Sequence, residues 1–323
     1  MKKNSRKIYL LYTFLYIILA VLIIYKPNYI ITKPGGIENI KNSYKIDSNN
    51  KIKGSVNITY LSTVKPNLLY YLYAKIRNWE ITKISDYAPN GLEKEEKVDS
   101  LLYLSSIDNA IYNAYKYANS KINIKDEKVY VEYSLNDESE LEEGDLILAI
   151  DDIKINKQDD IRNYLDKTDK TDVIVKYKRD NEIKTTNVRL INKNGKKYLG
   201  ISVIDIFDYE TDPKIEYSIK DDVAGPSGGA MITLSIYASL LDYDITKGLK
   251  IAGTGTIDRD GNIGPIGGVE YKIKSAIKSN VDVFFVPKYI NYYEVLDLNL
   301  DFGNMDVVPV EEFSDILNYL KKK

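Results

Sequence analysis

The chain has 323 residues, enough for two or three folded units with substantial cores, and it carries 45 basic against 47 acidic residues. This balance provides no strongly basic domain, so no nucleic-acid partner is expected. The sequence contains neither histidine nor cysteine. Ser-His-Asp and Cys-His catalysis, thiolate or imidazole metal sites and disulfide bonds are therefore excluded. We expect no metal and no cofactor, and a serine nucleophile would need a lysine or a carboxylate as its base.

The N-terminus has the pattern of a membrane anchor. Four positive charges within residues 1–7 precede an uncharged segment from Ile8 to Tyr25. At about 1.5 Å per residue this segment is roughly 27 Å long, which matches a bilayer core. A cleaved signal peptide is the alternative, but its apolar region would be shorter, and no small-x-small cleavage site follows Tyr25. We expect an uncleaved single-pass anchor in the plasma membrane, with the basic N-terminus in the cytoplasm and the rest of the chain outside.

Residues 28–124 combine strands with helices. The segment 54–64 alternates apolar and polar residues and predicts a half-buried strand. Pro66 then opens a run of helical character over residues 67–76. Residues 98–118 predict a long helix with one apolar face.

Residues 125–195 form a separate pattern of short strands, one short helix over residues 159–165 and a hairpin over residues 172–190. The sequence Leu-x-x-Gly-Asp-x-Ile over residues 141–147 resembles a PDZ domain. Such domains bind extended peptides as an added strand at a sheet edge. The alternative is a β-rich insertion without a ligand, because no glycine-rich carboxylate loop precedes Val129.

Gly225-Pro-Ser-Gly-Gly229 is a turn that leads into an apolar segment of helical length, residues 231–241. Ser227 would lie at the mouth of this helix, where free N–H groups and the helix dipole favour negative charge. That position suits a serine nucleophile whose attack creates an oxyanion. The alternative is an ordinary turn with a helix N-cap, and the turn alone does not decide between the two.

A second glycine-rich turn, residues 261–268, precedes Lys272. At helical spacing Lys272 falls on the apolar side with Ile273, whereas Lys274 and Lys278 point elsewhere. A lysine buried in apolar surroundings loses its proton more readily and can then act as a base. The alternative is a lysine whose stem covers apolar surface while its amine stays in water. The sequence also contains three Ser-x-x-Lys pairs, which we interpret as chance matches: Ser48/Lys51, Ser62/Lys65 and Ser275/Lys278.

The two turns together resemble the proteolytic domain of Lon-type serine peptidases. The family nucleophile lies in Gly-Pro-Ser-Ala-Gly, which corresponds to residues 225–229, and its lysine lies in Pro-Ile-Gly-Gly-x-x-x-Lys-x-x-Ala-Ala, which corresponds to residues 265–276. Thr-Gly-x-Ile and a strand ending in Ile-Pro correspond to residues 254–257 and 283–287. Four motifs in family order over a short stretch make a specific signal.

The resemblance implies that Ser227 is the nucleophile, that Lys272 is its base and that Thr254 supports the lysine by a hydrogen bond. Two residues depart from the family pattern: Ala224 stands where the family has Asp, and Thr256 where it has Glu. Both departures are similar to a subgroup of membrane-anchored Lon-like proteases with a PDZ domain and no ATPase. The roles of these two positions stay open.

The expected fold class is α+β: a Lon-type proteolytic domain with an inserted PDZ-like domain and one N-terminal transmembrane helix. The expected boundaries are 1–27 for the cytoplasmic stub and anchor, 28–124 for the N-terminal part of the protease domain, 125–195 for the PDZ-like domain and 196–323 for the catalytic part.

These features predict a serine endopeptidase that cleaves unfolded or membrane-proximal polypeptides. It would act without ATP, because the 323 residues contain no Gly-x4-Gly-Lys-Ser/Thr loop. The family resemblance implies a homo-oligomer, a hexamer by analogy. The alternative is a membrane-tethered, PDZ-like peptide-binding protein with an inactive protease scaffold.

Overall fold

The computed structural model describes residues 2–47, 52–136, 139–219 and 225–323. It contains two compact units. The small unit comprises Met1–Gly35 and Leu61–Leu92, and the large unit comprises Gly36–Tyr60 and Glu93–Lys323. β1 (Tyr29–Asn39) and β3 (Ser55–Val64) each contain residues of both units.

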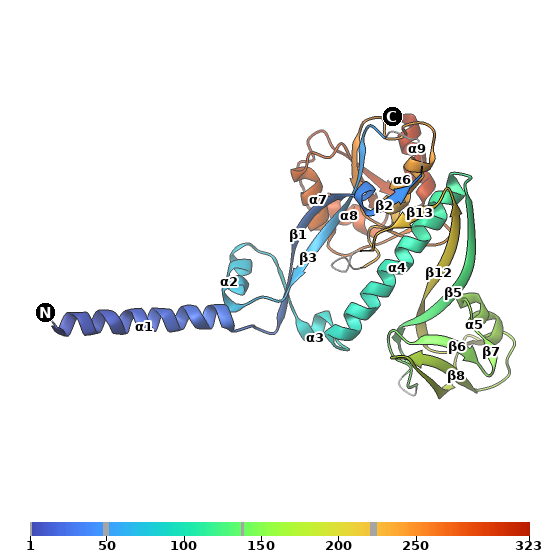
Figure 1. Cartoon of the computed structure of the whole chain (residues 1–323), viewed down its shortest axis with the longest axis horizontal. Coiled ribbons are helices and arrows are strands. Elements are labelled where there is room, and N and C mark those ends of the chain that lie inside the picture. The colour runs from blue at the N-terminus through green and yellow to red at the C-terminus, as the bar shows by residue number, and fades with distance from the viewer. Residues whose placement is uncertain (1, 48–51, 137–138, 220–224) are drawn as a thin grey trace. The chain divides into compact units, whose positions relative to one another are not determined.

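The small unit begins with α1 (Lys2–Ile24), one uninterrupted helix (Figure 1). Its segment Arg6–Ile24 is long and apolar enough to cross a membrane, as the sequence predicts. The first residues of β1 pair in antiparallel register with β4 (Glu80–Lys83). Between β1 and β4 along the chain lies α2 (Leu68–Ile76), whose N-cap Asn67 accepts a hydrogen bond from the backbone N–H of Tyr70. The short α3 (Ile84–Tyr87) follows β4.

A parallel sheet in the order β18-β17-β14-β3 lies in the centre of the large unit. Alternate residues of a strand face opposite sides of a sheet. Accordingly, Ile251 and Phe285 belong to one hydrophobic core, and Ala252 and Phe284 belong to another. The strands are β14 (Lys250–Gly253), β17 (Val283–Pro287) and β18 (Asp306–Val310).

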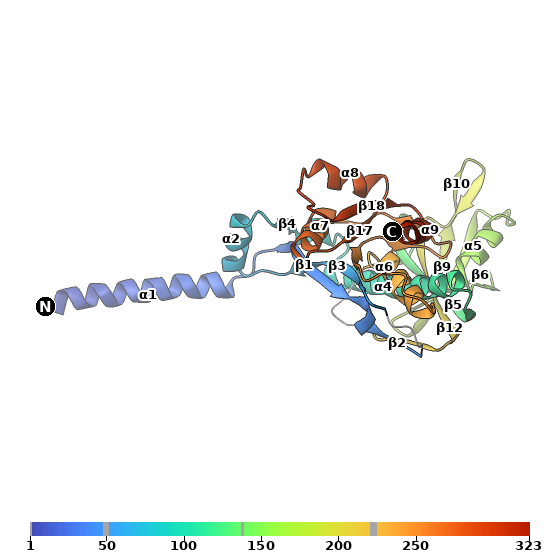
Figure 2. The same ribbon diagram turned by 90° about the horizontal axis from the view of Figure 1, so that it is seen from above.

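Helices cover both faces of this sheet (Figure 2). The first core contains residues of α4 (Leu92–Tyr117), α6 (Gly229–Leu240) and α9 (Phe313–Lys322). The second contains residues of α7 (Val269–Lys278) and α8 (Ile290–Asp297). The smaller elements are η1 (Ile40–Ser43), β2 (Tyr44–Ile46) paired with β13 (Ile215–Tyr217), and β15 (Thr256–Ile257) paired with β16 (Ile263–Gly264).

A second sheet forms a module inserted between α4 and β13, and we call residues 121–212 the inserted module. Its strand order is β12-β5-β6-β8-β9, with a core of its own. Its elements are β5 (Lys121–Ser134), β6 (Leu146–Ile150), β7 (Ile153–Lys154), α5 (Gln158–Leu165), β8 (Asp172–Arg179), β9 (Glu182–Arg189), β10 (Ile191–Lys193), β11 (Lys196–Tyr198) and β12 (Ile201–Asp212).

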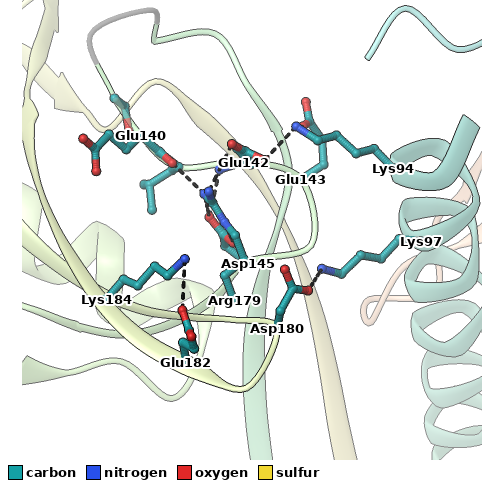
Figure 3. Close-up of polar contacts among 12 residues, drawn as sticks. Lys94, Lys97, Glu140, Glu142, Glu143, Asp145, Arg179, Asp180, Glu182 and Lys184 are labelled. Atoms are coloured by element: carbon teal, nitrogen blue, oxygen red, sulfur yellow. Dashed lines mark hydrogen bonds and ion pairs between the residues drawn. The ribbon is translucent and has the colours of Figure 1, made fainter. Parts of the chain in front are cut away.

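Salt bridges surround the loop before β6 (Figure 3). Buried Asp145 accepts two hydrogen bonds from Arg179, at 2.8 Å from Nε and 2.7 Å from Nη2, and this fixes the Gly-Asp turn of the predicted PDZ-like motif. On the side of α4, Lys94 pairs with Glu142 at 2.7 Å. Both partners of this second pair are exposed to solvent, so it contributes only about 0–1 kcal/mol to stability.

The structure confirms the mixed α+β fold. Some of its helices and strands begin or end at other residues than the sequence predicts. α4 begins at Leu92 and not at residue 98. The carboxylates of Glu93 and Glu95 lie in its first turn, where they interact favourably with the positive end of the helix dipole and so stabilise the earlier start. The inserted sheet continues beyond residue 195, since β12 pairs with β5 along its whole length to Asp212.

Candidate active site

Ser227 lies in the turn immediately before α6, whose N-cap is Gly228. The side chain is half-buried, while the helix behind it is buried from Gly229 to Ser239. The predicted position of Ser227 at a helix mouth is therefore present. The positive end of the helix dipole lies beside this serine.

Backbone N–H groups at this turn are available for an anion. Among the described residues, the N–H groups of Ser227 and Gly228 have no acceptor, whereas that of Gly229 donates to Pro226 O at 3.2 Å. The N–H of Ala230 donates to Gly255 O at 3.1 Å. Two free donors at the start of a helix form a site for an oxyanion.

Two hydrogen bonds connect α4 to the turn that contains Ser227. The N–H of Gly225 donates to the carbonyl oxygen of Asp99 at 3.2 Å, and the hydroxyl of Ser106 donates to Pro226 O at 3.0 Å. Burial raises the pKa of the Asp99 carboxyl above its ordinary value. These contacts are not predicted from the sequence, although Ser106 is a polar residue on the apolar face of the predicted helix.

Thr254 follows β14 and is fully buried. Its N–H donates to Phe285 O at 3.0 Å, which continues the pairing of β14 with β17. Its hydroxyl donates to the carbonyl oxygen of Ser227 at 3.0 Å and accepts a hydrogen bond from Lys272 Nζ at 3.1 Å. The hydrogen bond that the family resemblance implies between Thr254 and Lys272 is therefore present, and one hydroxyl connects the lysine to the serine residue.

Lys272 projects from α7 into the interior and is only 2 % exposed. Lys274 and Lys278 of the same helix are exposed, as the helical spacing predicts. This burial contradicts the alternative of an amine held in water. Burial lowers the pKa of Lys272 to about 8, and no acidic group of the described chain offsets this effect. About a tenth of the amine is thus neutral at pH 7, a far larger share than for a lysine in water, and this neutral fraction can accept a proton.

The departures from the family pattern have different outcomes. Thr256 lies in β15, where it pairs with Gly264 and so belongs to a backbone ladder. Ala224 and the pair Ser48/Lys51 lie outside the described residues.

Ser227 also borders a small cavity of about 50 Å³. Three tyrosines contribute to its wall, namely Tyr60, Tyr103 and Tyr217. Burial raises the pKa of Tyr217, which keeps its phenol neutral. The cavity therefore presents an apolar and aromatic surface beside the serine.

The region that contains these residues is similar to known proteins. The Lon protease (S16) C-terminal proteolytic domain matches residues 219–322. This part of the chain is a Lon-type proteolytic domain. The Lon protease of Campylobacter jejuni is 31% identical over 96 residues, and that of Aster yellows witches'-broom phytoplasma is 34% identical over 95 residues. Each alignment covers 29% of this chain and 12% of the relative, so the chain spans only a small part of the length of these curated relatives.

Two solved structures are similar to part of the chain. One is the PDZ domain of an SdrC-like protein from Listeria monocytogenes, which is 27% identical in sequence. The alignment covers 23% of the present chain and 85% of that structure, with a TM-score of 0.22. The other is the second domain of the Listeria protein Lin2157, also 27% identical. Its alignment covers 25% of the present chain and 85% of that structure, with a TM-score of 0.21.

Substitutions of the two glycines that follow Ser227, Gly228 and Gly229, test how closely this turn is packed. A Cβ at Gly229 would lie 2.8 Å from Ile257 Cγ2 and from Ser106 Oγ, closer than real contacts allow. A Cβ at Gly228 would lie 3.3 Å from Ile58 Cγ2, and the family motif has alanine there. We expect Gly229→Ala to destabilise the protein by about 1–3 kcal/mol and to displace Ser227. Gly228→Ala should change stability by less than about 1 kcal/mol.

Denaturant unfolding of both variants measures this difference. Equal stability of the two variants would contradict the close packing of Gly229 against α4 and β15.

Proposed function

We propose that the chain is an ATP-independent serine endopeptidase that uses a Ser227–Lys272 dyad. The observation that carries this proposal is the buried amine of Lys272, hydrogen-bonded to a threonine hydroxyl that also contacts the Ser227 backbone, within a Lon-type proteolytic domain. A charged amine in such surroundings is unfavourable, and a neutral amine is a base.

In the proposed reaction, Ser227 Oγ attacks the scissile carbonyl carbon while Lys272 Nζ accepts the hydroxyl proton. The N–H groups of Ser227 and Gly228 stabilise the oxyanion of the tetrahedral intermediate. Lys272 then donates its proton to the leaving amine, and the C–N bond breaks to leave an acyl-enzyme. Lys272 next takes a proton from water while the water oxygen attacks the ester carbonyl, and it returns this proton to Ser227 Oγ when the ester C–O bond breaks, which releases the acid and free Ser227.

The substrates follow from what the chain lacks and from its anchor. The sequence contains no phosphate-binding loop of the Gly-x4-Gly-Lys-Ser/Thr type, so no ATP-driven unfolding is proposed. Polypeptides that are already unfolded, flexible or close to the membrane are the proposed substrates. We further propose that α1 is a single-pass anchor in the plasma membrane, with the N-terminus in the cytoplasm and the proteolytic domain outside, in a homo-oligomer.

The full chain in detergent micelles, mixed with a fluorescently labelled unfolded casein, tests the activity. We expect cleavage into peptides at a rate that does not change when ATP and Mg²⁺ are added. Absence of cleavage of any unfolded protein would contradict the proposed function, and dependence on ATP would contradict its independence of a motor.

Substitution of Thr254 tests the connecting hydroxyl. Thr254→Val keeps the shape of the side chain but removes the acceptor of Lys272 and the donor to Ser227, so we expect cleavage to slow by about 10–100-fold. An acceptor oxygen favours the ammonium form, and its loss should lower the pKa of Lys272 further. The pH dependence of cleavage should therefore shift to lower pH. Thr254→Ser retains the hydroxyl and should restore most of the rate, whereas equal rates in both variants would contradict the role of the hydroxyl.

A second activity, peptide binding by the inserted module, is favoured by a groove of about 340 Å³ between α5 and β12. β12 is at the edge of its sheet, and the turn before it contains Gly200 with a φ of +77°. An extended peptide can add to such an edge as a further strand. This glycine turn lies before β12, whereas no glycine-rich loop precedes Val129. The buried Lys272 argues against an inactive protease scaffold, so we propose binding in addition to proteolysis.

A photo-crosslinking residue at position 201, in the groove, should capture a short biotinylated apolar peptide in the Ser227→Ala background. Ile183, exposed on β9 of the same sheet and outside the groove lining, is the matched control position and should not be crosslinked. Equal capture at both positions would contradict a peptide site in the groove.

A further inference from the structure

α2 presents an apolar stripe to solvent. Leu69, Leu72, Tyr73 and Ile76 follow the i, i+3, i+4, i+7 spacing of one helix face. In a surface helix such a stripe normally faces a core. Here Ala74 on the other side is buried, whereas Ile76 is 79% exposed and its three partners are nearly half exposed. Within the described residues, the apolar stripe of α2 is not covered.

A broad hollow of about 750 Å³ lies beside the stripe. It is lined mainly by apolar and aromatic side chains, among them Val64, Pro66, Leu69 and Tyr70, and Lys65 also contributes to the lining. The surface is therefore wider than the four residues of the stripe.

The position of α2 along the chain identifies what covers this surface. The backbone N–H of Leu68 donates to the carbonyl oxygen of Tyr25 at 2.8 Å, one residue after α1 ends. The rings of Tyr29 and Tyr71 pack at 5.1 Å. Figure 2 shows α2 next to the C-terminal end of α1. When the segment Arg6–Ile24 crosses a bilayer, the first turn of α2 therefore lies at the boundary between hydrocarbon and headgroups.

The chemistry around α2 fits that boundary. Trp79 packs on Tyr70 and Tyr73, with ring centroids 5.9 and 5.4 Å apart, and the amine of Lys33 lies 5.5 Å from the centroid of the Trp79 ring. Tryptophan and tyrosine are enriched at membrane–water interfaces. Outside α1, the small unit contains six lysine or arginine residues against two acidic residues, although the whole chain has a net charge of −2. This excess of positive charge complements anionic headgroups.

We propose that α2 is an interfacial helix, which inserts Leu69, Leu72, Tyr73 and Ile76 into the outer surface of a bilayer that contains anionic phospholipid. The proposal rests on α1 as an anchor and adds a second, reversible membrane contact beside it. α2 thus binds the lipid surface from one side of the bilayer, while α1 crosses it.

Trp79 is the only tryptophan of the chain, so its fluorescence reports on this surface alone. The full chain is reconstituted into phosphatidylcholine vesicles with and without phosphatidylglycerol, and brominated lipids are used as quenchers. Leu72→Glu/Ile76→Glu removes the apolar stripe at exposed positions, where folding is not at risk. Ile153→Glu/Ile183→Glu is the matched control, because both isoleucines are exposed on the inserted module.

We expect bromolipid to quench Trp79 in the wild type and in the control, more strongly with phosphatidylglycerol present. In Leu72→Glu/Ile76→Glu the quenching should fall by about threefold or more, while the chain still floats with vesicles after an alkaline wash. Quenching that is absent in the wild type, or unchanged in this variant, would overturn the proposal. Quenching that changes with protein density and not with lipid would also overturn it, because a second copy would then cover the stripe. Failure to float would instead contradict the anchor.

Discussion

Ser227→Ala and Lys272→Met should each lower the rate of peptide-bond cleavage by about 10³–10⁶-fold, to a residual level set by oxyanion binding alone. Ser227→Ala removes the oxygen that forms the acyl-enzyme. Lys272→Met keeps a side chain of similar length but removes the amine that the structure buries against Thr254. Because the two groups act as a unit, the double variant should be no slower than the more damaged single variant.

Lys278→Met is the matched control for the lysine, since Lys278 lies on the same helix and is exposed. It should cleave at the wild-type rate. Rates within about tenfold of the wild type for either Ser227→Ala or Lys272→Met would contradict the dyad, since general base catalysis alone contributes more than that.

Lys272→Met should also make the protein more stable. Burial lowers the pKa of Lys272 from 10.5 to about 8, so the unfolded chain binds the proton more tightly than the folded chain. Below pH 8 the amine is charged in both states, and its burial costs about 3 kcal/mol of folding free energy, a cost that methionine does not have.

The pH dependence of this difference has a definite sign. As pH rises from about 8 to 10.5, the folded state has already lost its proton while the unfolded state still has to lose it. The free energy of unfolding of the wild type should therefore rise relative to that of Lys272→Met across this range, and the gap should close. Urea unfolding of both proteins at several pH values measures the gap, and Lys278→Met should show none. A gap that stays constant or widens with pH would contradict a lowered pKa of Lys272.

The serine turn and the lysine helix could be predicted because both depend on local pattern. Glycines fix the turn before Ser227, and helical spacing alone places Lys272 on the apolar side of α7. The hydrogen bond from Lys272 to Thr254 could be expected from the family resemblance but not from spacing, because 18 residues separate them.

The support of the serine turn by α4 could not be predicted. Ser106 contacts Pro226 across 120 residues of sequence, and such a contact depends on how α4 packs in the core. The extent of the inserted module was equally out of reach. Strand pairing over such a distance does not follow from a local pattern, and β12 pairs with β5 as far as Asp212.

The small unit illustrates a different limit. Its helices could be predicted at residues 8–25 and 67–76, yet helical periodicity does not show whether an apolar face meets a core, a lipid or water. Only the buried Ala74 and the exposed Ile76 of α2 show which side faces the protein.

The rate at which a fluorophosphonate modifies the full chain, followed from pH 6 to 10 with mass-spectrometric mapping of the adduct, tests whether Lys272 is the base for Ser227. We expect one adduct, on Ser227, formed at a rate that rises with pH to a plateau with a midpoint near 8, the pKa of Lys272. In Lys272→Met this rise should be absent and the rate should stay low at every pH. An adduct on another residue, or the same pH-dependent modification of Ser227 without the lysine, would contradict it.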